Sequence, residues 1–466
     1  MRPGRFEFRM VILLVLASPT VSAFAQPLQI PHAALRFGRP IIPTAAVVPQ
    51  VDREGIPSPF AAPGPFVAEP AASRPGMTLD QLESIALANN PTILQAAMQV
   101  RAARGKMLQA GLYPNPMIGY IGEEMGAEGT AGQQGGFVGQ EIVTAGKLGL
   151  RSAVVAHEVQ QAEHAWQAQR HRVLNDVRTA WYETLAARQI VELNERLVGI
   201  GDEGVKAAEA LLEALEVSRV DVLQARIEAD RARLQLDDAR NRHRAALQRL
   251  AAVIGVPETE PALLIGALED DLPQLTWDGS RQRLLLESPE LAEARAGVQR
   301  ARCAVARECA ERVPNLDVRA ALLRHNVDRS TVATVEFGLP LNLFDRNQGN
   351  ICKARAELIA AENEVQRVEL VLQHRLAAAF ARYENARQEV EKYAADILTN
   401  AKTSLELIQT GYLQGEFDYV KLLTAQRTYF QVNLAYLESL LELQASRVMI
   451  DGLLLSGGLE RAPDGR

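Results

Sequence analysis

The sequence predicts a mainly α-helical protein with a small β part, arranged as two tandem structural repeats. Three observations predict this fold class. Two long stretches lack proline and are rich in strong helix formers. A series of short motifs recurs with a shift of about 200 residues. In each half, short segments with the period-two alternation of β-strands precede the long helical stretch.

Composition bounds the class of protein. The chain has 466 residues and a formal net charge of −7, with 47% hydrophobic but only 5% aromatic residues. Ala and Leu therefore supply the interior, as in long helices and coiled coils. The negative charge argues against nucleic acid as a partner, because phosphate binding requires basic patches. No phosphate loop, HExxH, Gly-x-Ser-x-Gly or CxxC motif is present. We therefore expect no enzyme activity, no catalytic residue, no cofactor and no metal site.

The N-terminus has the pattern of an export signal. Residues 1–25 combine three early arginines, a short apolar run and a small-residue cleavage site that ends at Ala25. Residues 26–76 are rich in proline and predict an extended segment. No later stretch holds 18 consecutive apolar residues, so a location in a membrane would require a closed β-barrel.

Duplicated motifs define the two repeats. Residues 77–257 form the first and residues 280–455 the second, with a linker at 258–279 and a C-terminal tail at 456–466. The paired motifs keep their order along the chain, which chance matches would not do. These pairs are Asn90-Pro91 with Ser288-Pro289, Pro114-Asn115-Pro116 with Pro314-Asn315, Gly139 with Gly338, Lys147 with Arg346, and Val220, Leu223 and Ala225 with Val420, Leu423 and Ala425.

Each repeat is predicted to begin with one helix followed by two strands. The helices are expected at about 78–112, with Thr78 as N-cap, and at about 280–312. A Pro-Asn pair ends each helix, because proline lacks the backbone donor and restricts the residue before it. Strand pairs are expected at about 113–143 and 314–343. Alternation is clear in the second pair, whereas the first is rich in glycine. An ordinary soluble hairpin would show the same alternation.

Long helices complete each repeat, at about 147–256 and 346–455. A helix over 147–212 would be roughly 100 Å long at 1.5 Å per residue. Such a helix needs coiled-coil neighbours to be stable. Four strands cannot close a useful barrel, since about eight only just enclose packed side chains. Three subunits would give a 12-stranded transmembrane β-barrel above a long α-helical coiled-coil barrel.

Several motifs together resemble the TolC family of outer-membrane efflux proteins. They are Ala110–Pro116, Gly139–Ile142 followed by Gly146-Lys147, Gly338-Leu339-Pro340-Leu341, Gly411–Gly415 and Leu422–Arg427, and the resemblance covers roughly residues 77–455. The Pro-Asn-Pro and Gly-Lys elements look most like the heavy-metal, CzcC-like branch. The strand and helix turns carry the motif residues Pro114, Pro116, Gly139, Gly146, Lys147, Pro314, Gly338, Pro340 and Gly415.

The resemblance implies a homotrimer in outer-membrane lipid that serves as a passive conduit. A periplasmic adaptor and an inner-membrane pump would dock at its periplasmic tip and supply the energy. Many relatives are lipidated at an N-terminal Cys, whereas this chain has the Pro-rich segment there. Channel sequences rarely define their cargo, so metal cations, small toxic compounds and secreted protein (a type I secretion channel) all stay open. A secreted periplasmic coiled-coil adaptor is the competing reading, but it leaves the duplicated strand pairs unexplained.

The family's closed tip places a gate at the helix reversals near 213–219 and 411–418. Carried over by position, Asp221 and Tyr412 resemble a gate pair, in which a phenol would donate to a carboxylate. Alternatively, Asp221 is a solvated helix residue and Tyr412 packs locally. The acidic constriction positions hold Lys421 and Thr424, and the gate arginine position holds Phe417. Glu416 and Asp418 lie close by and could supply negative rings.

His157, His164 and His171 recur every seven residues. On a helix, neighbours at this spacing are about 10.5 Å apart along the axis, too far to share one metal ion. We therefore interpret them as a polar stripe, with a metal way-station in the lumen as the alternative. Cys303, Cys309 and Cys352 imply neither a disulfide framework nor a metal site.

Overall fold

The computed structural model describes residues 76–126, 132–213, 217–257, 264–269, 274–326, 328–414 and 416–460. The predicted signal peptide, nearly all of the Pro-rich segment and Gly415 lie outside these residues. Within them the protein is mainly helical with one small sheet, as the sequence predicts.

The same order of elements occurs in each half of the chain: two helices, two strands and a long helical hairpin. The first half contains α1 (Leu79–Asn89), α2 (Pro91–Gly111), β1 (Met117–Glu123), β2 (Gln133–Ile142), α3 (Lys147–Glu213) and α4 (Arg219–Val253). The second half contains α5 (Trp277–Glu287), α6 (Pro289–Ala310), β3 (Leu316–His325), β4 (Thr331–Gly338), α7 (Gln348–Lys392), η2 (Tyr393–Ile397), α8 (Leu398–Leu413) and α9 (Tyr419–Asp451).

The prediction of a single helix before each strand pair is wrong, because each is broken near its start. Asn90 ends α1 and caps α2, accepting a hydrogen bond from the Thr92 N–H. Ser288 stands in the same place between α5 and α6, and its hydroxyl accepts from the Leu291 N–H. Proline follows each cap at the first helical position, where its missing N–H costs nothing but a continuous helix cannot pass.

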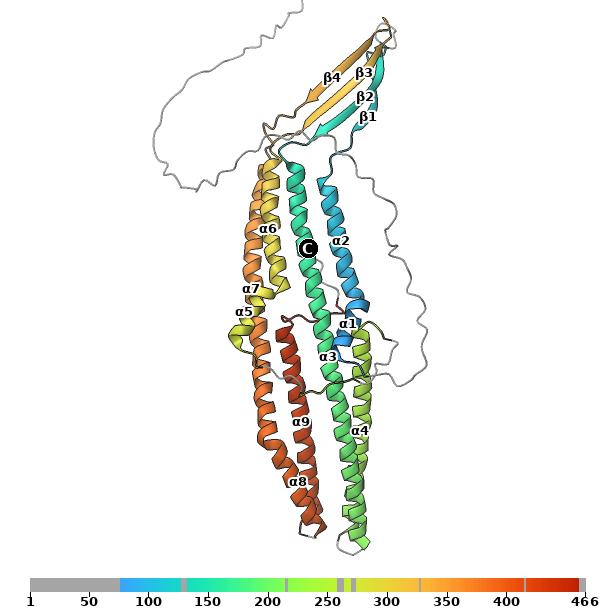
Figure 1. The fold of residues 1–466 in the computed structure, drawn as a ribbon, viewed down its shortest axis with the longest axis vertical. Coiled ribbons are helices and arrows are strands. Elements are labelled where there is room, and N and C mark those ends of the chain that lie inside the picture. Colours follow the sequence, from blue (N-terminus) through green and yellow to red (C-terminus); the bar gives the residue numbers. More distant parts are fainter. Residues whose placement is uncertain are drawn as a thin grey trace, which may run out of the picture. The chain divides into compact units, whose positions relative to one another are not determined.

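Helix α3 is the central element of the helical part and packs against α1, α2, α4, α6 and α9 (Figure 1). Its 67 unbroken residues agree with the helix expected over 147–212. Helix α7 packs against α6 and α9. Two apolar clusters hold these helices together. The larger includes Leu82, Leu291 and Leu440, which are fully buried, and the smaller lies at the ends of the long hairpins.

A π-helical segment, η2, joins α7 to α8. A π-turn holds one more residue than an α-turn and is the usual form of a single-residue bulge within a helix. The sequence predicts a continuous helix through this region. Neither proline nor glycine occurs in Tyr393–Ile397, so composition alone does not indicate the bulge.

The strands form one antiparallel sheet in the order β1-β2-β3-β4. Its centre joins the two halves of the chain, because Val138 of β2 pairs with Ala320 of β3. Strands β1 and β4 are the edges, and each has one partner within the sheet. Of the helices in the described ranges, none combines the length and apolar character needed to cross a membrane.

Candidate functional site

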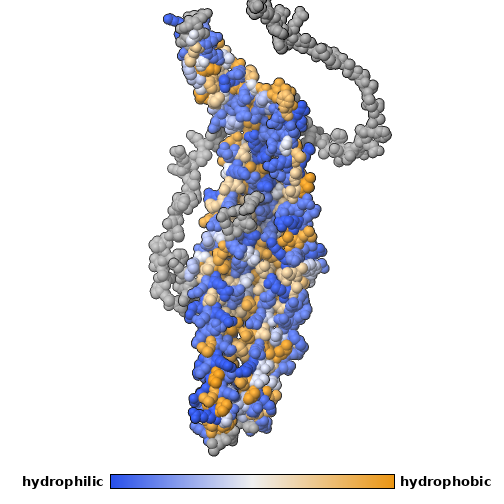
Figure 2. Space-filling view, turned by 180° about the vertical axis from the view of Figure 1, so that it is seen from behind, coloured by the Kyte–Doolittle hydropathy of each residue, from blue (hydrophilic) through white to orange (hydrophobic). Residues whose placement is uncertain are grey.

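The sheet has one face that is mainly apolar and one face that carries charge. The strand register places six exposed hydrophobic residues on the same face: Ile118, Tyr120, Val138, Leu322, Val335 and Phe337. The opposite face carries charge, and there Arg319 pairs with Glu336 at 3.7 Å and lies 4.6 Å from the centre of the Phe137 ring. Figure 2 shows hydrophobic side chains gathered on and next to the sheet, above helices that are largely hydrophilic. The alternation read from the sequence is therefore a real division between two surfaces.

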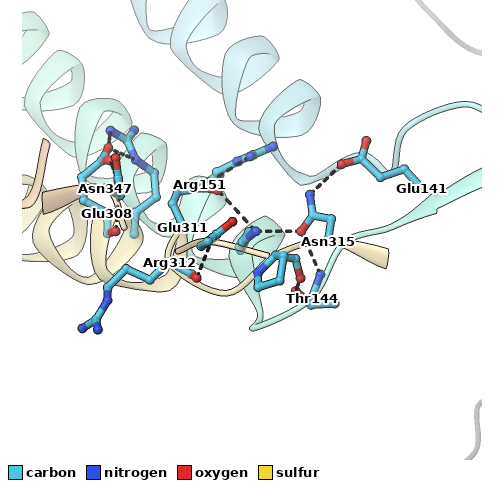
Figure 3. Close-up of polar contacts among 12 residues, drawn as sticks. Glu141, Thr144, Arg151, Glu308, Glu311, Arg312, Asn315 and Asn347 are labelled. Atoms are coloured by element: carbon cyan, nitrogen blue, oxygen red, sulfur yellow. Dashed lines mark hydrogen bonds and ion pairs between the residues drawn. The ribbon is translucent and has the colours of Figure 1, made fainter. Parts of the chain in front are cut away.

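A polar cluster ties the strands to the helices where the two halves of the chain meet (Figure 3). At its centre Lys147 is only 2% exposed. Its Nζ donates to Asn315 Oδ1 at 2.7 Å and lies 3.4 Å from Glu311 Oε2. Arg151 Nη2 holds the other oxygen of Glu311 at 2.9 Å, and Asn315 Nδ2 donates to Glu141 Oε1 at 2.6 Å. We call these five residues the junction cluster.

The turn residues predicted from the sequence lie around this cluster. The Thr144 hydroxyl donates to the Pro314 carbonyl at 2.6 Å, which joins the start of α3 to the chain before β3. Gly146 has φ 65°, a left-handed conformation that glycine adopts without strain, and so lets the chain turn into α3. The Pro114 carbonyl accepts from Gln140 Nε2 at 2.9 Å.

The remaining turn residues lie within the strands or next to them. Pro116 immediately precedes β1, Gly139 lies within β2 opposite Met117, and Gly338 ends β4 just before Pro340. Gly415 belongs to the part of the chain that the structure does not describe.

The far ends of the two helical hairpins pack on each other. Ala208 of α3 and Val222 of α4 share one apolar cluster with Tyr412 of α8 and Tyr419 of α9. Arg427 of α9 and Glu228 of α4 form an ion pair beside it. We call this region the tip cluster. Tyr412 belongs to it, and Asp221, the other member of the predicted gate pair, lies beside it in the first turn of α4.

The predicted gate pair is close but not hydrogen-bonded in this structure. Tyr412 is 3% exposed, and its hydroxyl has no hydrogen-bond partner among the described residues. The Asp221 carboxylate instead accepts from the Ser218 N–H at 2.9 Å and from its hydroxyl at 2.8 Å, which caps α4. Burial, with a further contribution from the Asp221 charge, raises the pKa of Tyr412. The gate assignment stays a prediction.

The neighbouring candidates surround the start of α9. The Asp418 carboxylate caps this helix, accepting from the Lys421 N–H at 3.0 Å. Lys421 Nζ lies 5.1 Å from the centre of the Phe417 ring, in a cation–π contact. Phe417, which stands at the position of the family's gate arginine, therefore binds a cation here but carries no charge of its own. Lys421 and Thr424 line a groove of about 260 Å³ between α8 and α9. Glu416 is exposed, and its N–H donates to the Gly411 carbonyl.

Two histidines of the predicted stripe lie next to local partners. His157 Nδ1 lies 2.9 Å from Gln160 Oε1, and His164 Nδ1 lies 3.4 Å from Gln167 Oε1. Burial, aided by the positive charges of Arg170, Arg178 and Arg283, lowers the pKa of His171. Over the described ranges, no group of three or more His, Cys, Asp or Glu side chains could hold a metal ion. The three cysteines, all within these ranges, are free.

The arrangement consists of two sheet surfaces and two clusters of contacts. The sheet presents an apolar and a polar face, the junction cluster fixes it to the helices, and the tip cluster closes the hairpins on each other. Sequence reasoning singled out Lys147 and Asn315 as motif residues but missed their contact, as well as the roles of Glu311 and Arg151. The contact between Lys147 and Asn315 could have been inferred from the duplicated motifs. Lys147 follows β2 and Asn315 precedes β3, and an antiparallel sheet brings these strand ends together.

The comparison with known families decides the assignment. The model of the outer membrane efflux protein family matches residues 82–256 and again residues 281–454. The chain belongs to this family. Members of the outer membrane efflux protein family are channels, so the predicted resemblance and the efflux function are confirmed. The two matched segments are nearly equal in length and follow the two halves of the chain.

Curated members of the outer membrane efflux protein family include metal-resistance proteins. The cobalt-zinc-cadmium resistance protein CzcC of Cupriavidus metallidurans is 27% identical over 378 residues, which cover 81% of this chain and 90% of CzcC. The nickel-cobalt-cadmium resistance protein NccC of Alcaligenes xylosoxydans is 24% identical over 304 residues, 64% of this chain and 68% of NccC.

Solved structures of similar fold include CusC and the outer membrane channel CmeC of Campylobacter jejuni. CusC superposes with a TM-score of 0.70 at 16% identity, and the match covers 84% of this chain and 96% of CusC. CmeC gives a TM-score of 0.66 at 16% identity over 83% of this chain and 87% of CmeC. At this identity the likeness concerns the fold alone.

Proposed function

We propose that this efflux protein works as a homotrimer in the outer membrane, exported by its N-terminal signal peptide. Each subunit contributes four strands to a twelve-stranded barrel and its long helices to a tube that extends into the periplasm. The two halves of the chain act as tandem structural repeats. The observation that carries the proposal is the two-faced sheet. Its apolar face suits lipid, its polar face suits a water-filled lumen, and its edges β1 and β4 are open for neighbouring subunits.

Reconstitution tests this assembly. The full protein, purified in detergent and added to planar lipid bilayers, is expected to have the mass of three chains and to give discrete conductance steps. A protein that has the mass of one chain and produces no conductance would refute the proposal. The double variant Leu322→Glu/Phe337→Glu places charges on the apolar face and should block insertion, whereas Glu336→Gln on the polar face should insert normally.

We propose divalent metal cations as the cargo, delivered by an inner-membrane pump through a periplasmic adaptor that docks at the tip. The support is the resistance to cobalt, zinc, cadmium and nickel named for the two curated relatives. Small toxic compounds are the competing cargo. Deletion of the gene should lower the tolerated concentration of Zn²⁺, Cd²⁺ or Co²⁺ and leave tolerance to dyes and detergents unchanged. The reverse pattern would replace metals with organic compounds.

We propose that the tip cluster is the closed gate of this channel. Tyr412 and Asp221 would form its reversible tie, and Glu416, Asp418 and Lys421 would line the narrow passage. The support is that the charge of Asp221 reaches the buried Tyr412 hydroxyl, which has no partner within the described residues. Tyr412→Phe should raise the leak conductance of the closed channel, whereas Tyr429→Phe, at a partly buried tyrosine next to the same cluster, should not. Equal leak in both variants would remove Tyr412 from the gate.

A further inference from the structure

The junction between the two halves of this chain is complete within one subunit. Strand β2 pairs with β3, and α3 packs against α6. At its base Lys147, from the first half, is buried against Asn315, from the second. This junction shows how the start of one repeat's long helix meets the beginning of the next repeat's strand pair.

The two edge strands of the sheet are flanked by the counterparts of these junction residues. Each counterpart lacks its partner within the subunit. The counterpart of Lys147 is Arg346, two residues before α7, and the counterpart of Asn315 is Asn115, just before β1. Lys147 is 2% exposed, whereas Arg346 is exposed. Asn115 is exposed too, and its side chain makes no hydrogen bond within the described ranges. The chain's sheet keeps these residues on opposite edges, so one subunit cannot bring them together.

The packing of the helices shows the same asymmetry. Helix α6 contacts both long helices, α3 and α7, and buries Ala296, Gly297 and Ala301. Its counterpart α2 packs against α3 but has no comparable contact with α7 among the described elements. Leu94 and Leu108 of α2 are therefore 62% and 70% exposed. Helix α2 thus lacks the neighbour that α6 has in α7.

The chemistry of the two open ends is complementary. After β4 the chain exposes Leu341, Leu343 and Phe344, the last to 91%. Before β1 it exposes Leu112 and Tyr113, to 52% and 63%. Apolar side chains thus lie on both sides of the missing contact. Patches of this kind on a folded chain mark an interaction surface.

We propose that Arg346 of each subunit donates a hydrogen bond to Asn115 of the partner subunit, within an apolar seam formed by Leu343 and Phe344 against Leu112 and Tyr113 of the partner subunit. The proposal rests on the trimer proposed above and specifies its contact. The change from Lys to Arg fits this role. Glu311, the acid that balances Lys147, is replaced by Gly111 in the first half, and an arginine fork can satisfy several neutral oxygens at once. Arg346 Nε already donates to the Leu343 carbonyl at 3.3 Å, which orients it.

Site-directed cross-linking tests this contact. In a background with Cys303, Cys309 and Cys352 replaced by Ser, the double variant Asn115→Cys/Arg346→Cys is treated with a short bismaleimide in native membranes. We expect covalent dimers and trimers on denaturing gels. Each single variant should stay a monomer on the gel. The control Lys147→Cys/Asn315→Cys joins positions within one chain and should cross-link without forming dimers or trimers.

The oligomer mass, measured on the untreated protein, separates the two levels of the hypothesis. If the protein is a trimer but the Asn115→Cys/Arg346→Cys variant does not cross-link, this contact is wrong and the channel assignment still stands. Phe344 would then be covered by lipid. A monomer overturns the contact and the proposed trimer together. As a second measurement, Arg346→Glu should lower the temperature at which the trimer dissociates, and Asn115→Lys added to it should restore that temperature. If Asn115→Lys restores none of the dissociation temperature that Arg346→Glu lowers, the result counts against the contact.

Discussion

Replacing Lys147 by Met is expected to loosen the junction cluster. Methionine keeps an unbranched apolar stem of similar reach, so the packing around the side chain is largely preserved. The substitution removes the ammonium group, which donates to Asn315 Oδ1 at 2.7 Å and lies 3.4 Å from Glu311 Oε2. The base of the sheet then loses the charge-assisted contact that Lys147 makes between the two halves of the chain.

The size of the effect depends on the contacts that Glu311 keeps after the substitution. A hydrogen bond to a charged group contributes about 1.5–3 kcal/mol. Breaking a buried ion pair costs about 3–5 kcal/mol, because the other charge is left uncompensated. Here Glu311 keeps 27% exposure of its side chain and its contact with Arg151, so the second penalty is reduced. We expect a loss of about 2–3 kcal/mol in the local stability of the junction.

Hydrogen–deuterium exchange of the intact protein measures this quantity directly. Peptides covering residues 141–151 and 308–318 should exchange about 30- to 150-fold faster, since each 1.4 kcal/mol is a factor of ten. Lys106→Met is the matched control, because its ion pair with Glu158 is at a lysine side chain 63% exposed and contributes at most about 1 kcal/mol. If Lys147→Met changed exchange no more than the control does, the junction cluster would not stabilise the base of the sheet.

Three further predictions concern the tip cluster and η2. Gly411→Ala should destabilise the tip by about 1–3 kcal/mol in exchange measurements, because its Cβ would lie 2.5 Å from the Phe417 ring, whereas Gly105→Ala, with open space around it, should be neutral or stabilising. Burial raises the pKa of Tyr419 to about 12 from 10.0, so the neutral phenol stabilises the fold below pH 10 and this stability is lost as the pH rises toward 12. Unfolding midpoints of Tyr419→Phe should fall less over that range, and equal slopes would contradict the assignment. Deleting Ala394 should convert η2 to α-helix and leave oligomer yield intact, whereas deleting one residue from the middle of α3 should abolish assembly by rotating everything beyond it by about 100°.

Much of the architecture could be predicted from the sequence because its signals are strong and local. The absence of proline and the density of helix formers predicted α3, and period-two alternation predicted the faces of β3 and β4. The break at Asn90 is also predictable in principle, because a cap residue followed by proline ends one helix and starts the next.

The candidate site was harder to predict for physical reasons. Contacts such as Lys147 with Asn315 depend on the sheet register, which no local pattern specifies. The π-turn of η2 arises from packing around the helix, and its residues have ordinary helix propensities. At the tip, family position suggested Asp221 as a gate residue, but its local role in capping α4 with Ser218 could have been read from the sequence, since a serine lies three residues before the acid.

The unequal construction of the two hairpins has a mechanical consequence. In the first half an uninterrupted rod of 67 residues runs from the sheet to the tip, whereas in the second half the matching path is jointed at Tyr393–Ile397. Bending concentrates where the regular ladder of backbone hydrogen bonds is disturbed. Strain applied at the tip is therefore expected to be absorbed by the jointed limb, while the rigid limb keeps its length and angle. One subunit would then combine a rigid helix with a jointed one, and displacement of the end of the second hairpin would leave the sheet undisturbed.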